Sequence, residues 1–465
     1  MPRRLRLAPR ATELAAGFAA LRAELGVPEA YPEAAAAEAA AAADAYAGER
    51  RDATDVAFVT IDPPGSRDLD QAFHAERRGG GYRVRYAIAD PGAFVTPGGP
   101  LDEESRARGV TLYSPDKRTP LYPTALSEGR ASLLDGADVP AVLWTLDLDA
   151  AGEPAAVTVE RATVRSRARL DYETVQRAID GGTADPSLAL LRDVGTLRLE
   201  RERDRGGVSL PTPDQEVVAG DGGYALRYRP RLPVETWNAQ ISLLTGIAGA
   251  RVMLDGGLGL LRTMPEPVPE DVAELRRSAA ALGVAWPEEM PYAARVGSLV
   301  PAVPAQAALL NLAATLMRGA GYTAFDGAPP AQAEHSAVAA PYAHVTAPLR
   351  RLADRFANEV VLALHAGREV PAWCRDSLPA LPDLMVAADR RARTLEREVL
   401  DYVEAVVLAP RVGEAFDAVV VGDGVVQLAD PAVRGRYKGA AEPGTAVRVR
   451  LAEVDVAQRR VRFGD

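Results

Sequence analysis

The stretch 58–72 constrains the fold most, because it joins an apolar run to three closely spaced aspartates. The run 56–61 predicts a buried strand, and that strand ends on Asp62. A Pro-Pro-Gly sequence then predicts a turn, after which Asp68 and Asp70 follow with one residue between them. A strand end followed by a tight loop can bring all three carboxylates to one point.

Three carboxylates a few ångström apart disfavour joint ionisation. A divalent cation removes this repulsion, and hard cations such as Mg²⁺ prefer oxygen ligands. The pattern therefore indicates a metal site. A second interpretation stays open from these residues alone, namely an Asp-, Pro- and Gly-rich loop whose carboxylates only cap backbone amides.

Length and composition narrow the class of protein. The 465 residues give room for two or three domains. No apolar run approaches the 18 residues of a membrane span, and the N-terminus lacks the apolar region of a signal peptide. The single cysteine, Cys374, excludes a disulfide framework within the chain and a Cys-based zinc site. We therefore expect a cytoplasmic protein without membrane contact.

The formal charge of −10 argues against a surface that binds nucleic acid everywhere. It allows a local basic groove within an acidic surface. The basic residues other than Lys117 and Lys438 are arginines, which contact phosphates through two parallel donors where lysine acts as a point charge.

The first 50 residues predict two short helices. Apolar residues share one helical face between Leu14 and Leu25, and an Ala-rich second helix runs from Glu33 to about Tyr46. The pair could be a helix-turn-helix element that binds RNA or DNA. The interpretation we favour is that both helices pack on the neighbouring domain.

The rest of the chain divides by its periodicity. Residues 56–169 are β-rich, with a hairpin of strands 142–148 and 157–164. Helices dominate afterwards, at 171–179, 233–254, 269–282, 305–319, 349–366 and 383–408. From residue 411, alternating strands at 414–422, 424–428, 446–454 and 459–463 suit a five-stranded OB-type barrel, a common nucleic-acid reader. We predict an α+β chain with a short all-α N-terminal segment (1–52), a mixed β-sheet and helical core (53–410) and a C-terminal OB-type β-barrel (411–465).

Several further motifs follow the acidic loop in a fixed order. They are Ile88-Ala-Asp-Pro91, Leu112-Tyr113-Ser-Pro115, Leu121-Tyr-Pro-Thr-Ala-Leu-Ser127, Ser132-Leu-Leu134 and Tyr342-Ala-His-Val-Thr-Ala-Pro-Leu-Arg350-Arg-Leu-Ala-Asp354. Together they resemble the catalytic domain of the ribonuclease II/R family, the RNB nucleases. The resemblance runs from about residue 54 to 410, and the final barrel resembles the RNA-binding OB domain of that family.

The resemblance implies a 3′→5′ exoribonuclease that degrades RNA processively to nucleoside 5′-monophosphates with Mg²⁺. Asp62, Asp68 and Asp70 match three of four clustered metal-binding aspartates, and Gln71 stands at the fourth position. Asp68, Asp70 and Arg350 are the expected catalytic residues. Arg350 would donate two hydrogen bonds to the scissile phosphate, whereas its alternative is a helical pairing with Asp354.

Four residues match substrate-binding positions of the family. Tyr113 corresponds to the tyrosine that holds the 3′-terminal nucleotide, and a stacked base contributes roughly 1–3 kcal/mol. Tyr172, Glu235 and Glu396 resemble further positions along the RNA channel.

Two departures from the family pattern carry their own expectations. Gln71 brings no charge, so we expect weaker metal affinity or better support of activity by Mn²⁺. The short helical N-terminus replaces the usual two cold-shock barrels, so we expect a more open entrance that admits RNA duplexes with 3′ overhangs as well as single-stranded RNA. We expect a monomer.

Two rival functions compete with this interpretation. One is a catalytically weakened, RNA-binding protein of the RNB fold, in which cleavage was lost when the fourth acid became Gln71. The other is a carboxylate exonuclease of the Asp-x-Glu kind, for which the sequence lacks the expected strand start and late partner motif.

Overall fold

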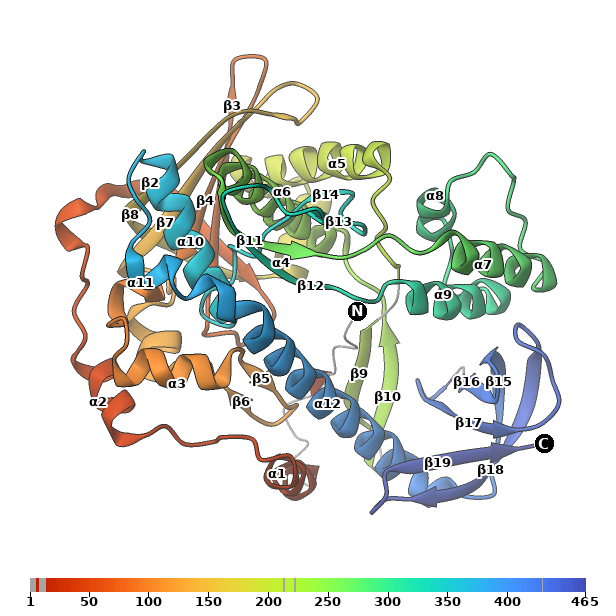
Figure 1. The fold of residues 1–465 in the computed structure, drawn as a ribbon. Helices are drawn as coiled ribbons and strands as arrows, with labels where there is room; N and C mark the ends of the chain where they lie inside the picture. Colours follow the sequence, from red (N-terminus) through yellow and green to blue (C-terminus); the bar gives the residue numbers. More distant parts are fainter. Residues whose placement is uncertain (1–5, 8–13, 212–213, 221–222, 429) are drawn as a thin grey trace.

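The computed structural model describes residues 6–7, 14–211, 214–220, 223–428 and 430–465. Within these residues the chain is a mixed helix and strand protein with two closed five-stranded barrels, and a long helix leads into the second of them (Figure 1). The predicted α+β class is confirmed. The predicted boundaries at residues 52 and 410 stay predictions.

The first barrel carries the acidic loop. Its strands are β2 (Arg51–Asp62), β3 (Gln71–Arg78), β4 (Gly81–Ala89), β7 (Asp138–Leu148) and β8 (Pro154–Asp171). They are ordered β2-β3-β4-β7-β8, and the parallel pairing of β2 with β8 closes the barrel. The strand residues Phe58, Phe73, Tyr86 and Trp144 are almost completely buried. The predicted strand 56–61 lies within β2, whereas the closure of the barrel was not predicted.

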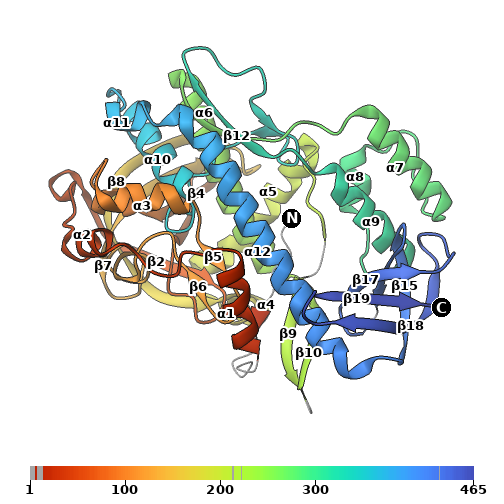
Figure 2. The ribbon, with the colours of Figure 1, turned by 60° about the horizontal axis from the view of Figure 1, so that its bottom comes forward.

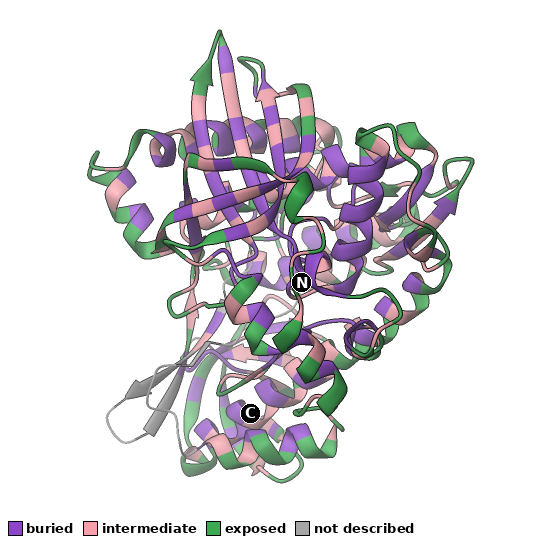
Figure 3. Cartoon of the chain, turned by 90° about the vertical axis from the view of Figure 1, so that its left-hand side faces the viewer, coloured by how far each residue is buried: buried purple, intermediate pink, exposed green. Residues whose placement is uncertain are grey.

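Helices cover this barrel and extend from it. They are α3 (Pro100–Arg108), α4 (Tyr172–Asp180), α5 (Pro186–Arg205), α6 (Pro233–Gly256), α7 (Pro269–Ala281), α8 (Tyr292–Gly297), α9 (Pro304–Leu316), α10 (Leu352–His365), α11 (Ala372–Arg375) and α12 (Leu381–Leu408). Figure 3 shows buried residues running along the barrel strands and the helices beside them, with exposed residues at the outer strand ends.

The structure corrects two helix expectations. The 20-residue helix α5 was not predicted, because the charged residues of its second half obscure the apolar face formed by Leu188, Leu191 and Val194. The predicted helix 349–366 begins only at Leu352, so Arg350 lies in the turn before it.

Short strand pairs lie outside the barrels, and the region after residue 170 is less uniformly helical than predicted. The strands are β1 (Arg6–Leu7), β5 (Leu112–Tyr113), β6 (Arg118–Thr119), β9 (Asp214–Gly220), β10 (Gly223–Arg229), β11 (Leu258–Thr263), β12 (Gly321–Asp326), β13 (Glu334–His335) and β14 (Ala340–Pro341). β9 pairs with both β1 and β10, and β11 pairs with β12.

The second barrel is the predicted C-terminal one. Its strands are β15 (Ala415–Gly422), β16 (Val425–Leu428), β17 (Arg434–Lys438), β18 (Ala446–Asp455) and β19 (Arg460–Gly464), and the closed order is β15-β16-β17-β19-β18. β17 was not among the predicted strands. The helix α12 reaches this barrel, where Arg459 Nε lies 2.8 Å from Glu398 Oε2.

The N-terminal helices α1 (Ala15–Glu24) and α2 (Glu33–Ala41) both pack on the rest of the chain. Phe18 is fully buried, and its ring centroid lies 5.6 Å from that of Tyr402 on α12; Figure 2 shows α1 beside α12. Glu38 of α2 accepts hydrogen bonds from the backbone amides of Thr96 and Leu101. Packing, the favoured interpretation, is thus observed, although α2 ends before the expected position near Tyr46. Among the described residues, no helix has both the length and the apolarity that crossing a membrane requires.

Candidate active site

The acidic loop is held in place by the motif that begins at Ser132. The buried Ser132 hydroxyl accepts a hydrogen bond from the Leu69 amide at 2.9 Å and donates one to the Arg67 carbonyl at 2.6 Å. The Leu133 amide donates to the Leu69 carbonyl. The Ser-Leu motif therefore fixes the backbone that presents Asp68 and Asp70.

Asp62 ends β2 and has an oxygen without a partner. Its Oδ2 atom is buried and makes no hydrogen bond within the described part of the chain. Burial raises the pKa of Asp62 to about 7, partly offset by Arg350 and reinforced by the charge of Asp68. An orphaned buried carboxylate oxygen is costly unless something compensates for its charge.

Asp70 is the most deeply placed of the three carboxylates, with only 5% of its surface exposed. The Leu349 amide donates to Asp70 Oδ1 at 2.8 Å. Burial raises the pKa of Asp70 to about 8, although Arg350 and the Leu349 amide both favour its ionised form. The hydrogen bond from the Leu349 amide also attaches the acidic loop to the segment before α10.

Arg350 faces Asp70 rather than Asp354. Arg350 Nε lies 3.2 Å from Asp70 Oδ2, although the contact is not aligned as a hydrogen bond and Nε has no hydrogen-bond partner in the described residues. The neighbouring Arg351 makes the pairing with Asp354, through two contacts of 2.8 Å. The helical-pairing alternative for Arg350 was therefore wrong, and it applies to the next residue instead.

Asp68 faces the hairpin of β5 and β6. The Tyr113 hydroxyl donates to Asp68 Oδ2 at 3.3 Å, and the Arg118 guanidinium donates to Asp68 Oδ1. The two hairpin residues are direct cross-strand partners. Sequence reasoning missed Arg118, although the Ser-Pro-Asp-Lys stretch between it and Tyr113 is a turn signal that could have predicted the hairpin.

Gln71, the first residue of β3, makes neutral hydrogen bonds. Its Oε1 atom accepts from the Tyr86 hydroxyl at 2.6 Å and from the Ser242 hydroxyl at 3.4 Å, and its amide donates to the Thr346 carbonyl at 2.6 Å. The oxygen that was expected to bind metal is thus already used by hydroxyl groups. Its role as a metal ligand stays a prediction.

The three expected channel residues lie further along the helices. Tyr172 is the first residue of α4 and contributes to the electrostatic environment of the Tyr86 hydroxyl. Glu235, in the first turn of α6, accepts from Arg229 at 2.7 Å and from the Leu232 amide at 3.3 Å. Glu396 lies midway along α12 and is partly buried. Their contacts with RNA stay predictions.

The donors of the site decide whether it suits a divalent cation. No group of three or more His, Cys, Asp or Glu residues in the described ranges is arranged to hold a metal ion. The unpartnered Asp62 oxygen and the buried Asp70 nevertheless fit a cation, since both are hard oxygen donors whose negative charge is poorly compensated. Asp68 differs, because Arg118 and Tyr113 already occupy its two oxygens.

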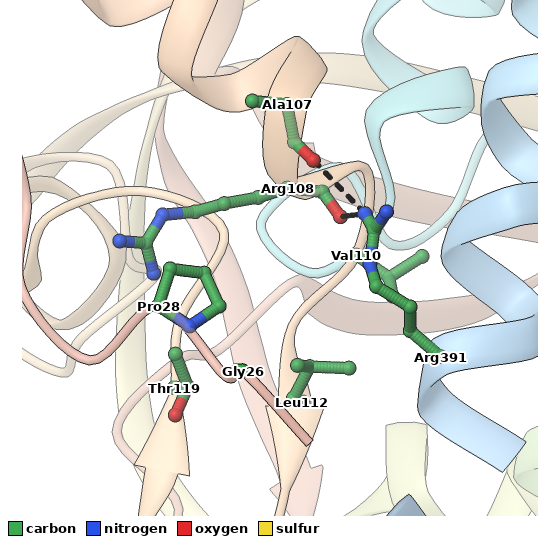
Figure 4. Close-up of a pocket in the computed structure, with 8 residues that line it drawn as sticks. All are labelled: Gly26, Pro28, Ala107, Arg108, Val110, Leu112, Thr119 and Arg391. Atoms are coloured by element: carbon green, nitrogen blue, oxygen red, sulfur yellow. Dashed lines mark hydrogen bonds between the residues drawn. The ribbon is translucent and has the colours of Figure 1, made fainter. Parts of the chain in front are cut away.

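A cavity of about 180 Å³ lies behind the hairpin. Figure 4 shows it between the segment after α1, the end of α3, the hairpin and α12. Arg391 of α12 borders it and donates to the carbonyls of Ala107 and Arg108, both at 2.9 Å. Leu112 and Thr119 line it; they form the cross-strand pair next to Tyr113 and Arg118, so by strand alternation they point to the opposite face.

Comparison with known families agrees with this geometry. The RNB domain model matches residues 50–366, and the model of the RNase II-type exonuclease C-terminal S1 domain matches residues 414–464. Because the first match alone covers more than half of the chain, this protein belongs to the ribonuclease II/R family. The predicted family and the C-terminal barrel are thereby confirmed.

Individual relatives extend the comparison. The chain is 30% identical over 362 residues to exosome complex exonuclease RRP44 homolog A of Arabidopsis thaliana, covering 73% of this chain and 38% of the relative. It is 27% identical over 405 residues to ribonuclease R of Escherichia coli, covering 81% and 49%. This chain thus spans half or less of the length of these curated relatives. RNase R of Mycoplasma genitalium, solved with ribose-methylated single-stranded RNA, shares the fold with a TM-score of 0.87 at 18% identity, covering 96% of this chain and 77% of that one.

Proposed function

We propose that this protein is a metal-dependent 3′→5′ exoribonuclease that hydrolyses single-stranded RNA processively to nucleoside 5′-monophosphates. One observation carries the proposal: the buried carboxylates Asp62 and Asp70 both lie in the field of the Arg350 guanidinium, and Asp62 Oδ2 has no hydrogen-bond partner among the described residues. Membership of the ribonuclease II/R family supports the same activity.

Each residue has a role that its position permits. A divalent cation, Mg²⁺ or Mn²⁺, held by Asp62 and Asp70 would supply stabilisation of charge on phosphoryl oxygens when bound. Arg350 would donate hydrogen bonds to the scissile phosphate as negative charge develops. Asp70 would also orient the attacking water.

Tyr113 would hold the terminal nucleotide. Tyr113 is 47% exposed as a residue, while its hydroxyl contacts Asp68. An exposed ring beside the carboxylates offers a stacking surface for the last base, so that the scissile bond lies at the acidic loop. Arg118, on the neighbouring strand, lies within reach of the same nucleotide.

The alternative function is a weakened RNA-binding protein of the same fold. The replacement of a fourth carboxylate by Gln71 and the pairing of Asp68 with Arg118 favour it. The buried Asp62 oxygen without a hydrogen-bond partner in the described residues argues against it, because such an oxygen is costly to bury unless a cation or a donor compensates for its charge.

A single assay separates the two functions. RNA labelled at its 5′ end is incubated with the protein in Mg²⁺ or Mn²⁺, with the Asp70→Asn variant and a 3′-blocked RNA as controls. An exoribonuclease yields nucleoside 5′-monophosphates and a short labelled limit fragment from the open 3′ end only. Binding without any product in either metal would refute the proposal.

The substrate range extends this proposal. We infer that duplexes with a 3′ overhang are also digested, because RNase R of Mycoplasma genitalium, whose fold this chain shares, was also solved in complex with double-stranded RNA. A series of graded overhangs tests this, and digestion that always stops several nucleotides before the junction would contradict it. The cytoplasmic location and the monomeric state stay predictions.

A further inference from the structure

Arg118 lies at the acidic loop, although it stands between two of the motifs quoted above, Leu112–Pro115 and Leu121–Ser127. The turn of the hairpin is closed by the Ser114 amide, which donates to the Lys117 carbonyl at 2.9 Å. Arg118 then follows as the cross-strand partner of Tyr113. Its side chain is 28% exposed and also reaches Glu128 at 3.3 Å. Arg118 is therefore held by two carboxylates and remains open to solvent on one side.

Because Arg118 pairs with Asp68, it competes with a divalent cation for that carboxylate. A carboxylate that a guanidinium already neutralises attracts a divalent ion less, because both seek the same oxygens. With Tyr113 on the second oxygen, neither Asp68 oxygen is free in this structure. A partly exposed ion pair is weak enough to exchange.

The pairing of Arg118 with Asp68 affects cation binding because the site contains few carboxylates. Gln71 contributes no charge, so Asp62, Asp68 and Asp70 are the anionic side chains of the acidic loop, and they share the site with two guanidiniums. An incoming cation therefore meets three carboxylates of which Asp68 is already paired with a guanidinium, whereas Asp62 keeps an oxygen without a partner among the described residues. Releasing Arg118 would restore one carboxylate to the site.

We propose that Arg118 is an exchangeable counter-ion of Asp68. In the free protein it holds Asp68 and opposes cation binding, and when cation and RNA enter it transfers to a backbone phosphate of the RNA. The transfer is geometrically direct, because cross-strand partners have Cβ atoms roughly 5 Å apart and Tyr113 is proposed to hold the terminal nucleotide. This inference rests on the function proposed above.

The test begins with metal binding by the full-length protein without RNA. Mn²⁺ binding is measured by calorimetry for the wild type, Arg118→Gln and the matched control Lys117→Gln. Lys117 carries the same charge one residue away but pairs with Glu29 at 3.0 Å. We expect Arg118→Gln to bind Mn²⁺ roughly fivefold more tightly, the scale of one partly exposed ion pair, while Lys117→Gln matches the wild type.

The second measurement concerns RNA, whose binding should weaken in the variant that binds Mn²⁺ more tightly. At saturating Mn²⁺, Arg118→Gln should raise the KM for single-stranded RNA several-fold, and the dependence of log KM on log salt should flatten by about one phosphate contact. Arg118→Lys, which keeps the charge, should bind Mn²⁺ nearly as the wild type does. A purely structural arginine would not tighten metal binding while weakening RNA binding.

The outcomes separate this inference from the proposed function. If the wild type binds Mn²⁺ and cleaves RNA, but Arg118→Gln binds Mn²⁺ equally or more weakly, the counter-ion role is wrong and the proposed function stands. If the wild type neither binds Mn²⁺ nor cleaves RNA, both are wrong. Thermal unfolding of each variant shows whether it is folded. If Arg118→Gln is unfolded, Arg118→Met, which retains the aliphatic stem, takes its place in both measurements with the same expected results.

Discussion

Arg350 Nε lies 3.2 Å from Asp70 Oδ2, and the amide of the residue before Arg350 donates to the other oxygen of the same carboxylate. Two motifs far apart in the sequence therefore meet at one carboxyl group. The Thr111 amide donates to the Arg350 carbonyl at 3.0 Å, which joins the arginine to the strand that leads to Tyr113. Backbone hydrogen bonds thus link the segments that carry Arg350, Asp70 and Tyr113, which are the proposed phosphate donor, metal ligand and nucleotide clamp.

The first prediction concerns the shape of this donor. Arg350→Lys keeps the charge but loses the planar two-point donor, and removal of one transition-state donor lowers kcat roughly 10²–10³-fold. Single-turnover cleavage of labelled RNA measures the effect, with Arg67→Lys, a largely exposed side chain, as the control. Turnover close to that of the wild type would make Arg350 a structural residue.

The second prediction separates cleavage from folding at Asp70. Asp70→Asn should abolish cleavage while RNA affinity stays within several-fold, because the arginines that bind phosphate remain. The variant should stay folded, since the amide can still accept from Leu349, with an unfolding temperature at or below that of the wild type because Arg350 loses the charge that faces it. Gel assays, fluorescence anisotropy and thermal unfolding give the three readouts. Retained cleavage would remove the acidic loop from the mechanism.

The local part of this site was accessible from the sequence. The strand before Asp62, the turn after it and the order of the motifs follow from apolar periodicity and turn residues, which act over a few positions. The C-terminal barrel was predicted for the same reason, since its strands alternate clearly.

The partners of these residues were not accessible, because tertiary packing decides them. Gln71 is contacted from β4, α6 and the segment before α10, and no local pattern marks that meeting. Arg118 sits on a strand of two residues, which is too short for any periodicity. Its pairing with Asp68 therefore became visible only in the folded chain.

The third prediction follows from the neutral bonds of Gln71. Gln71→Asp was expected from the sequence to strengthen metal binding, but it also removes the donor to the buried Thr346 carbonyl. An unsatisfied buried polar group destabilises a protein by roughly 1–3 kcal/mol. We therefore expect a lower unfolding temperature in chelator and a larger rise with Mn²⁺ than in the wild type. If Gln71→Asp and the wild type unfold at equal temperatures both in chelator and in Mn²⁺, position 71 neither contacts the metal nor stabilises the fold through Thr346.

The fourth prediction concerns pH and a histidine remote from the acidic loop. Burial, with a smaller effect from the charge of Arg262, lowers the pKa of His335 to about 4. An unfolded histidine titrates near pH 6.5, so the unfolded state binds more protons between these values and stability falls as pH falls. The free energy of unfolding is therefore unaffected by His335 above about pH 6.5, where the histidine is neutral in both states. It decreases on acidification toward pH 4, as the unfolded state takes up the proton.

Thermal unfolding between pH 7.5 and 4.5 measures this slope. His335→Gln should show a shallower loss of stability on acidification than the wild type, whatever its absolute stability. His344, partly buried beside Tyr322, has its pKa lowered by burial and nearby arginines, so part of the slope should survive in the variant. Parallel curves for both proteins would contradict the assignment.

The last prediction gives the N-terminal segment a role in the clamp. The Tyr31 hydroxyl donates to the Pro120 carbonyl at 2.5 Å, and Arg108 lies 3.8 Å above the Tyr31 ring. Arg22 of α1 contacts Asp116 in the hairpin turn at 2.8 Å. The segment therefore supports the back of the hairpin whose front carries Tyr113, beside the cavity of Figure 4.

Tyr113→Ala should release longer limit fragments without slowing the first cleavages, because the last nucleotide loses its stacking surface. Tyr31→Ala should produce the same lengthening in weaker form, since the hairpin loses a support but keeps its clamp. Glu33→Ala, at the exposed start of α2, is the control and should leave the fragments unchanged. High-resolution gels of the end products compare all three. If Tyr31→Ala gives fragments identical to the wild type while Tyr113→Ala lengthens them, the segment only covers the core.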